Sequence, residues 1–361
     1  MTTSKIKSDK MKKVNNTAGL KLFLSVVLLI AAAGCKKEGI KEDSTAKEKA
    51  PTAVSSGDHL PSWNDTKVKQ DIIAYVKDVT NTESPNFIPV KDRIATFDND
   101  GTLWAEQPFY FQLFFALDQV KALAPKHPEW KSKQPFKAVL ENNMGELMKQ
   151  GKAGLMQIVA VSHAGMSTDE FEASVGKWIS TAKHPTKKKL YRELIYQPML
   201  VLVKYLQDNQ FKVFIVSGGG IDFMRAWAED VYGIPKDQIV GSTLQAKYDY
   251  NNGKPVITKL PALDFNDDKE GKPVAIEKYI GKKPVFSAGN SDGDLQMLQW
   301  AASNKYKNFE LYVHHTDSIR EWAYDRKSPV GTLDKGLDEG KAKNWAFADM
   351  KKDWKVIFPG N

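Results

Sequence analysis

Two aspartates one residue apart follow an apolar segment, in the run Arg93–Trp104 that reads RIATFDNDGTLW. The four residues Ile94–Phe97 have the character of a buried parallel strand, and the residues after them are typical of a turn. Ligands of open α/β sheets bind at the carboxyl ends of the strands, where Asp98 and Asp100 would then lie. One carboxylate could act there as a nucleophile and the other as its acid/base partner. Taken alone, the same run is also compatible with an ordinary acidic turn.

Polar residues also follow two other strand-like segments. Phe211–Val216 runs into Ser217 and three glycines, and Pro284–Ala288 opens into the sequence GNSDGD at 289–294. Lys272 lies between these segments, at the start of a predicted helix. Because the carboxyl ends of parallel strands meet at one edge of a sheet, we expect these groups to lie near the two aspartates. Each group alone has a simpler explanation, Ser217 as part of a strand-to-helix turn and Lys272 as one of several surface lysines.

In this order, the four pieces resemble the four motifs of the haloacid dehalogenase-like superfamily of phosphohydrolases. The resemblance covers about residues 90–315, and the layout is most similar to the phosphoserine phosphatase-like branch. It implies a Mg²⁺-dependent phosphatase for a small phosphomonoester, in which Asp98 attacks phosphorus to form an aspartyl-phosphate and Asp100 is the acid/base. By the same resemblance, Ser217 donates a hydrogen bond to a phosphoryl oxygen and Lys272 contributes a cation.

The resemblance also implies which residues hold the Mg²⁺. The expected ligands are Asp98, the backbone carbonyl of Asp100, Asn290 and Asp294. The family usually has an aspartate directly after the glycine of the fourth motif, whereas this chain has Asn290. An amide oxygen can ligate Mg²⁺ but brings no charge. Two alternatives stay open: Asn290 serves with Asp294 behind it, or Asp292 has taken over the role.

Residues close to these motifs complete the expected site. Contacts to the substrate are expected from Thr102, Trp104, Glu106 and Gly218. His314 and His315 follow the last strand-like segment, and we expect them to be partly buried hydrogen-bonding residues rather than metal ligands.

The elements that would position these residues alternate between strand and helix. Strand character is found in 94–97, 211–216, 284–288 and 309–313, and a hairpin in 244–250 and 255–260 around Asn252 and Gly253. Helical patterns are found in 68–79, 109–124, 136–149, 154–161, 168–182, 189–208, 221–231, 273–280 and 295–302, and an amphipathic closing element is expected around Trp345 and Trp354. This order predicts an α/β fold with a Rossmann-like, mostly parallel sheet. The predicted core comprises 63–104 and 191–361, with a helical cap inserted at 105–190 after the first strand.

The amino-terminal segment 1–34 is typical of a bacterial lipoprotein signal peptide. A lysine-rich front precedes an apolar run, and Cys35, the single cysteine of the chain, follows two alanines and a glycine. The 13 residues Leu22–Gly34 are too few to cross a bilayer, which needs about 20. We therefore expect lipidation at Cys35, a location in the bacterial cell envelope, and membrane contact through the lipid anchor only. Either Met1 or Met11 could be the true start.

The net charge of +8 comes largely from this leader. Without residues 1–34, which hold six lysines and one aspartate, 46 basic and 43 acidic residues remain, a net charge of +3. We expect no nucleic-acid partner on that ground. Residues 35–62 are charged and poor in large apolar groups, which predicts a disordered tether.

Two other functions remain open from the sequence. A dehalogenase-type hydrolase shares the first aspartate but typically lacks the second, so Asp100 and Asp294 count against it. A lipid-anchored protein that binds a phosphate ester without turning it over is the other alternative, since Asn290 removes a charge from the expected metal site. The sequence fixes neither the alcohol half of the substrate nor the oligomeric state.

Overall fold

A seven-stranded sheet runs through the computed structural model, which describes residues 57–360, and its strand order is β4-β3-β2-β1-β5-β6-β7. The strands are β1 (Ile94–Phe97), β2 (Lys212–Gly220), β3 (Ile239–Asn251), β4 (Lys254–Phe265), β5 (Phe286–Gly289), β6 (Phe309–His314) and β7 (Ala346–Asp349). All neighbouring pairs are parallel except β3 and β4, which form an antiparallel hairpin. The predicted α/β class with a mostly parallel sheet is therefore confirmed.

Strand β1 occupies the middle of the sheet, which explains its apolar sequence. All four of its residues are buried, and the strand pairs with β2 on one side and β5 on the other. Phe97 lies opposite Ile215 and Ala288, so the three strands reach the same edge of the sheet within a few residues. The segments that follow these strands meet at that edge.

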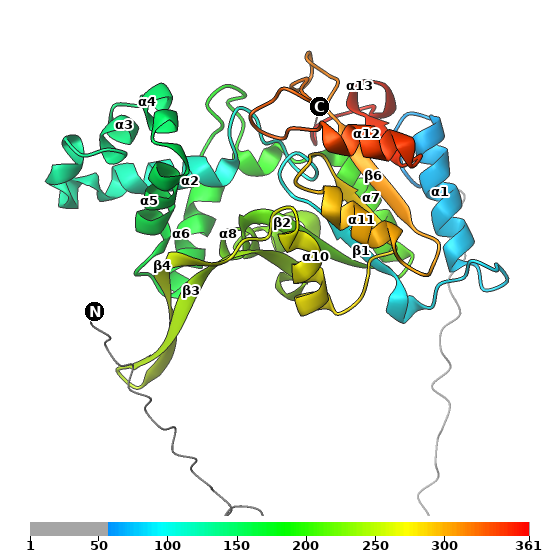
Figure 1. Ribbon diagram of the computed structural model, residues 1–361, viewed down its shortest axis with the longest axis horizontal. Coiled ribbons are helices and arrows are strands. Elements are labelled where there is room, and N and C mark those ends of the chain that lie inside the picture. Colours follow the sequence, from blue (N-terminus) through cyan, green and yellow to red (C-terminus); the bar gives the residue numbers. More distant parts are fainter. Residues whose placement is uncertain (1–56, 361) are drawn as a thin grey trace, which may run out of the picture. The chain divides into compact units, whose positions relative to one another are not determined.

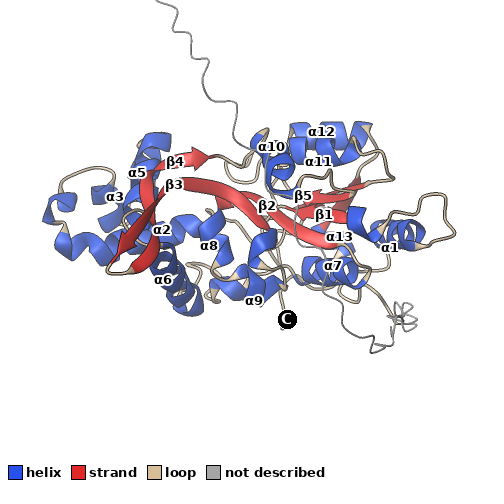
Figure 2. Ribbon diagram, turned by 90° about the horizontal axis from the view of Figure 1, so that it is seen from below, coloured by secondary structure: helices blue, strands red, loops and turns tan. Residues whose placement is uncertain are grey.

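Helices cover both faces of the sheet. The helices of the core are α1 (Lys67–Thr80), α7 (Gln197–Asp208), α8 (Ile221–Arg225), α9 (Ala228–Tyr232), α10 (Gly271–Ala275), α11 (Leu295–Ala302), α12 (Lys335–Ala342) and α13 (Met350–Asp353). Figure 2 shows α10, α11 and α12 on one face of the strands, with α1 and α7 on the other. The predicted helix at 221–231 is in fact the pair α8 and α9, and α7 begins at Gln197, just before Pro198, rather than at 189.

The chain between β1 and β2 contains a group of helices beside the core (Figure 1). They are α2 (Phe111–Leu123), α3 (Phe136–Leu140), α4 (Met144–Lys149), α5 (Gly151–His163) and α6 (Thr168–Thr181). The helix predicted over 136–149 is broken into α3 and α4, and Asn142 between them has a positive φ of 53°. Hairpin β3–β4 joins this group, since the N–H of Lys259 donates to the carbonyl of Met166 at 3.0 Å.

The described residues begin within the last part of the predicted tether. There, Leu60 is buried and Asp58 pairs with Lys69 at 2.7 Å. The region around Trp345 and Trp354 contributes a seventh strand, β7, as well as helices, because its short segment Ala346–Asp349 pairs with β6. The leader, Cys35 and most of the predicted tether lie outside the described residues. In the described part of the chain, no helix combines the length and apolar character needed to cross a membrane.

Candidate functional site

Lys272 joins two carboxylates at the edge where β1, β2 and β5 end. Its Nζ lies 2.6 Å from Oδ1 of Asp98 and 2.6 Å from Oδ1 of Asp294, and it donates to the carbonyl of Val216 at 2.8 Å. Asp98 follows β1 directly, and its N–H donates to the carbonyl of Ala288 on β5 at 2.9 Å. Lys272 is 1% exposed, so both ion pairs are shielded from water. Three of the residues expected at the site are therefore brought together.

The two aspartates of the first motif have different surroundings. Burial and the charge of Asp294 raise the pKa of Asp98, and the charge of Lys272 opposes that rise. Burial also raises the pKa of Asp100, to about 6, although the indole N–H of Trp104 donates to its carboxylate at 2.7 Å. A carboxyl group with such a pKa is partly protonated near neutral pH, which suits an acid/base partner.

Trp104 supports Asp100 and does not reach the cavity, which corrects its expected role in substrate contact. The residue is fully buried, and its ring stacks on Trp227 with centroids 4.2 Å apart. Thr102 is corrected in the same way, because it is fully buried and its hydroxyl donates to Oδ1 of Asn290 at 3.2 Å. Both side chains hold other site residues in place.

Glu106 makes a contact that the sequence did not indicate. Nδ2 of Asn290 donates to its Oε1 at 2.7 Å, and the hydroxyl of Tyr324 donates to the same oxygen at 2.7 Å. Burial raises the pKa of Glu106 to about 8, against the effect of the Tyr324 hydrogen bond. Gly101 permits this approach, since it has a φ of 75° and any Cβ there would collide with Asn290 and Glu106.

Asp294 positions the loop of the fourth motif. Its Oδ2 accepts the backbone N–H groups of Asn290 at 2.9 Å and Ser291 at 3.0 Å, while its Oδ1 accepts from Lys272. Both oxygens thus have partners within the protein, and because Asp294 also lines the cavity described below, its role at the metal stays a prediction. Asp292 is removed from the ligand set, because its carboxylate accepts the N–H groups of Asp334 at 2.9 Å and Gly336 at 2.8 Å at the start of α12.

A cavity of about 350 Å³ opens onto these groups. Its wall includes the expected residues Asp98, Asp100, Glu106, Ser217, Gly218, Lys272 and Asp294. Ser217 is buried, and its Oγ accepts the N–H of Gly219 at 3.1 Å, so the hydroxyl proton can be donated toward a ligand. Five carboxyl groups line the cavity, those of Asp98, Asp100, Glu106, Asp268 and Asp294, against the single cation of Lys272.

This charge excess fits a bound hard cation. If every carboxyl group were ionised, five negative charges and one positive charge would leave the wall at −4. Burial opposes such ionisation, and it raises the pKa of Asp268 as well as that of the neighbouring Asp267, the latter to about 7. Within residues 57–360, no three His, Asp or Glu side chains converge on a common point. A divalent ion would therefore need the amide oxygen of Asn290 and backbone oxygen as well, which are the donors that Mg²⁺ accepts.

Three further residues contribute to the site, and only one of them, Asp268, carries a signal in the sequence. Gln112 on α2 and Tyr324 in the loop after β6 belong to no recognisable sequence motif. Asp268 belongs to the acidic pair Asp267–Asp268 shortly before Lys272, which a search for acidic turns could have found. His315 follows the expectation for a hydrogen-bonding residue, because its Nε2 lies 2.7 Å from the carbonyl of Gly101. Burial lowers the pKa of His315 to about 3, so the ring is neutral and donates to that carbonyl.

Comparison with known proteins gives a family and a fold. Residues 95–299, more than half of the chain, match the model of the haloacid dehalogenase-like hydrolase family. No curated protein sequence matches the chain significantly. A conserved protein of unknown function from Anaerococcus prevotii has a similar fold, with a TM-score of 0.54 and 15% identity over 83% of this chain and 98% of that one.

Two other solved structures are more distant. A protein of unknown function from Bordetella pertussis matches with a TM-score of 0.45 and 13% identity, over 72% of this chain and 99% of that one. A phosphoserine phosphohydrolase-like protein from Francisella tularensis matches with a TM-score of 0.36 and 16% identity, over 70% and 99% of the two chains.

Proposed function

Because the chain belongs to the haloacid dehalogenase-like hydrolase family, we propose that it is a phosphatase that hydrolyses small phosphomonoesters through an aspartyl-phosphate. The observation that carries the proposal is the ion pair of Asp98 with Lys272 at 2.6 Å, on the wall of a cavity that Asp100 also lines. A nucleophile, a cation and a second carboxyl group are the groups that phosphoryl transfer to a carboxylate requires.

In the first half of the reaction, Asp98 is the nucleophile. Its Oδ1 is held by Lys272, and its other carboxylate oxygen forms the new bond to phosphorus while the bond from phosphorus to the ester oxygen breaks. The leaving alcohol takes the proton of Asp100, whose raised pKa keeps that proton available. Ser217 and Lys272 donate hydrogen bonds to the phosphoryl oxygens as charge builds on them.

In the second half, water replaces the alcohol. Asp100, now ionised, takes a proton from a water molecule that attacks phosphorus, and the bond between phosphorus and Asp98 breaks. Inorganic phosphate leaves, Asp98 is again a carboxylate, and Asp100 is again protonated. The two aspartates thus return to their starting states.

We also propose that the site works with Mg²⁺. Its residues would be the carboxylate of Asp98, the carbonyl of Asp100 and the amide oxygen of Asn290, with Asp294 behind Asn290. The carboxyl group of Glu106 lies beside Asn290 and would supply the charge that Asn290 lacks once it ionises against a cation. When bound, the cation reduces the repulsion between the carboxylates and the anionic ester. This use of Glu106 replaces its expected role in substrate contact alone.

The test compares phosphate release by the wild-type protein and by Asp98→Asn in excess Mg²⁺. We expect Asp98→Asn to lower kcat at least about a thousandfold on p-nitrophenyl phosphate, while exposed Asp230→Asn leaves it unchanged. Acid-quenched wild-type enzyme should carry phosphate on Asp98 by mass spectrometry. Full activity of Asp98→Asn would refute the nucleophile, and the absence of phosphate release from any ester would refute the phosphatase.

The two alternative functions gain less support. Dehalogenation has no use for a second carboxyl group poised as an acid, yet Asp100 lines the cavity and has a raised pKa. A binding protein without turnover is an alternative because Asn290 removes a charge from the expected metal site. The contact of Asn290 with Glu106 places a second carboxyl group there, which can ionise when a cation is bound.

The lipid anchor is a separate proposal that rests on the sequence of residues 1–35. We propose that Cys35 is lipidated and holds the folded domain at a membrane of the bacterial cell envelope, with the outer membrane or its periplasmic face as the destination. Expression with a labelled fatty acid tests it, because the label should appear on the wild-type protein and be lost in Cys35→Ser. A labelled Cys35→Ser protein would refute it.

A further inference from the structure

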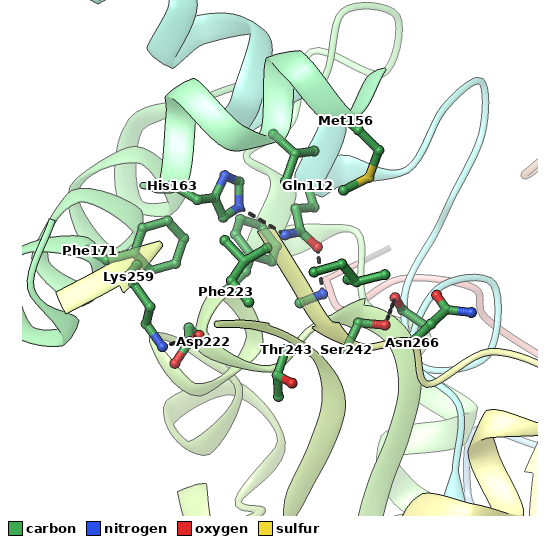
Figure 3. Close-up of a pocket in the computed structure, with 15 residues that line it drawn as sticks. Gln112, Met156, His163, Phe171, Asp222, Phe223, Ser242, Thr243, Lys259 and Asn266 are labelled. Carbon is green, nitrogen blue, oxygen red and sulfur yellow. Dashed lines mark hydrogen bonds and ion pairs between the residues drawn. The ribbon is translucent and has the colours of Figure 1, made fainter. Parts of the chain in front are cut away.

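Figure 3 shows a second cavity of about 200 Å³, here called the side cavity. It adjoins the catalytic cavity, with which it shares part of its wall. Its walls come from α5, α6, α8 and hairpin β3–β4. Four residues line both cavities: Gln112, Val159, Gly218 and Asn266. A ligand whose phosphate lies at Asp98 could therefore extend its organic part past these residues into the side cavity.

Most of the side-cavity wall is hydrocarbon. Six apolar side chains contribute to it: Met156, Val159, Phe171, Phe223, Leu244 and Leu263. A cavity of about 150 Å³ lined by similar side chains binds benzene in another protein. The side cavity thus has room for about one six-membered ring or a short branched alkyl chain.

Three polar side chains of the side cavity, those of Gln112, Lys259 and Asp222, already have partners within the protein. Gln112 uses both ends of its amide, with Oε1 accepting the N–H of Gly220 at 2.7 Å and Nε2 lying 3.0 Å from Nε2 of His163. Lys259 and Asp222, the one cation and the one carboxylate among the described residues of the wall, form an ion pair at 2.5 Å. Their charges therefore neutralise each other. These bonds are drawn in Figure 3.

His163 adds no charge to the wall. Burial lowers its pKa to about 4, and its Nδ1 lies 2.7 Å from Oγ of Ser162. The Ser162 hydroxyl donates to the carbonyl of Ile158 at 2.8 Å, so Nδ1 donates to Ser162 and Nε2 accepts from Gln112. The ring is therefore fixed in one neutral form.

We propose that the side cavity binds the organic half of the phosphate ester and that this half is uncharged and apolar, about the size of one ring. This inference rests on the phosphatase function proposed above and names its substrate class. The apolar wall stabilises such a group by removing it from water. An ammonium or carboxylate group would lose its hydration there and would gain a partner only by breaking the Lys259–Asp222 pair.

Three esters of primary alcohols test the substrate class. Ethyl phosphate leaves the side cavity unfilled, benzyl phosphate adds a ring, and O-phosphoethanolamine adds an ammonium group. We expect kcat/KM for benzyl phosphate to exceed that for ethyl phosphate at least about tenfold, and that for O-phosphoethanolamine to fall below it. Equal values for benzyl and ethyl phosphate, or a preference for the ammonium ester, would overturn the proposal.

Variants on one helix then locate the effect. Met156 lines the side cavity only, whereas its neighbour Gln157 is exposed, so Met156→Glu and Gln157→Glu add the same charge inside and outside the cavity. We expect Met156→Glu to abolish the preference for benzyl over ethyl phosphate and Gln157→Glu to retain it. Leu244→Lys on β3 adds a charge from another element and should act like Met156→Glu. Retained preference in both cavity variants would overturn the proposal.

A binding experiment keeps the inference separate from the phosphatase function. The leaving group itself, benzyl alcohol, should bind the wild-type protein in ligand-observed NMR, and the signal should be lost in Met156→Glu but not in Gln157→Glu. If no ester is hydrolysed but this pattern is seen, the phosphatase proposal fails and the apolar ligand site stands. If ethyl phosphate is hydrolysed but benzyl alcohol binds all three proteins equally or none, the side-cavity proposal fails alone.

Discussion

Asn290 donates its side-chain N–H to the carboxylate of Glu106 at 2.7 Å, although the two residues are 184 positions apart in the chain. The contact places a carboxyl group beside the residue that lacks one in the fourth motif. It also fixes the amide, whose Oδ1 accepts the hydroxyl of Thr102 at 3.2 Å.

The first prediction concerns this pair. We expect Glu106→Gln to weaken Mg²⁺ binding about tenfold or more, because the group beside the amide can then no longer ionise to balance the charge of the cation. Asn290→Asp should lower the Tm of the Mg²⁺-free protein, because two buried carboxylates then face each other, and added Mg²⁺ should restore it. The double variant Glu106→Gln/Asn290→Asp moves the carboxyl group from position 106 to position 290 and the amide from position 290 to position 106. It should bind Mg²⁺ more tightly than Glu106→Gln does. Calorimetric titration with Mg²⁺ measures these affinities, and unchanged binding by Glu106→Gln would contradict the role given to Glu106.

Lys272 provides the second prediction. Lys272→Met leaves Asp98 and Asp294 buried without their cation, which we expect to lower the free energy of unfolding by about 3–5 kcal/mol at pH 8. The loss should be smaller at pH 5, since the pKa of Asp98 is raised by burial and the unpaired carboxyl group can take up a proton. Urea unfolding at both pH values measures the effect, with exposed Lys278→Met as the control. A loss that is the same at pH 5 and pH 8 would show that packing, rather than charge, sets it.

Much of this site could be predicted from local sequence because it follows strands. Asp98 and Ser217 lie at the ends of strands whose apolar residues mark them as central, and parallel strands end at a common edge. By sequence, Lys272 could also be one of several surface lysines, yet it is the residue whose contacts join Asp98 and Asp294. The hairpin was predictable for a similar local reason, since Asn252 and Gly253 favour a tight turn.

The remaining parts depend on contacts between distant segments, which spacing does not encode. Tyr324 reaches Glu106 across 218 positions, and no periodicity relates the loop after β6 to the first motif. Asp292 has the right residue type and sequence position for a metal ligand. Its carboxylate instead accepts backbone N–H groups at the amino terminus of α12, a segment more than 40 residues further along the chain. Strand β7 was missed because Ala346–Asp349 is short and derives its stability from pairing with β6.

The third prediction separates Asp292 from the metal. Asp292→Ala removes the acceptor of the N–H groups that open α12, and we expect a loss of about 1–3 kcal/mol in the free energy of unfolding. The affinity for Mg²⁺ should stay within about twofold of the wild-type value, because the carboxylate faces the helix. Chemical denaturation and calorimetric titration of the same protein give both numbers. A tenfold weaker Mg²⁺ affinity with unchanged stability would return Asp292 to the ligand set.

The fourth prediction uses Trp104 to move the pH dependence of the reaction. Its indole N–H donates to the ionised form of Asp100 and so holds the pKa of that group down against burial. In Trp104→Phe this hydrogen bond is lost, the pKa of Asp100 rises above about 6, and the acid stays protonated to higher pH. We expect the alkaline limb of the profile of kcat/KM against pH to move upward by about one unit.

Trp227→Phe is the matched control for that shift. Trp227 stacks on Trp104, but its indole N–H has no hydrogen-bond partner among the described residues. Its replacement should change packing and leave the alkaline limb in place. An equal shift in both variants would show that ring packing, and not the hydrogen bond, sets the pKa of Asp100.

The last prediction concerns Glu310, a buried carboxyl group on β6 away from the catalytic cavity. Its Oε1 has no hydrogen-bond partner within the described chain, and burial raises the pKa of Glu310 from 4.5 to about 7. The folded protein therefore holds this proton more tightly than the unfolded chain, so the free energy of unfolding falls as the pH rises from about 4.5 to about 7. Glu310→Gln has no such proton to lose and should gain stability relative to the wild type across that window, by up to about 3 kcal/mol at pH 8.

Urea unfolding from pH 5 to pH 8 measures the difference, with Glu83→Gln at an exposed position as the control. If the wild-type and Glu310→Gln curves stay parallel over this range, the carboxyl group is ionised in the fold and a cation or water must compensate it.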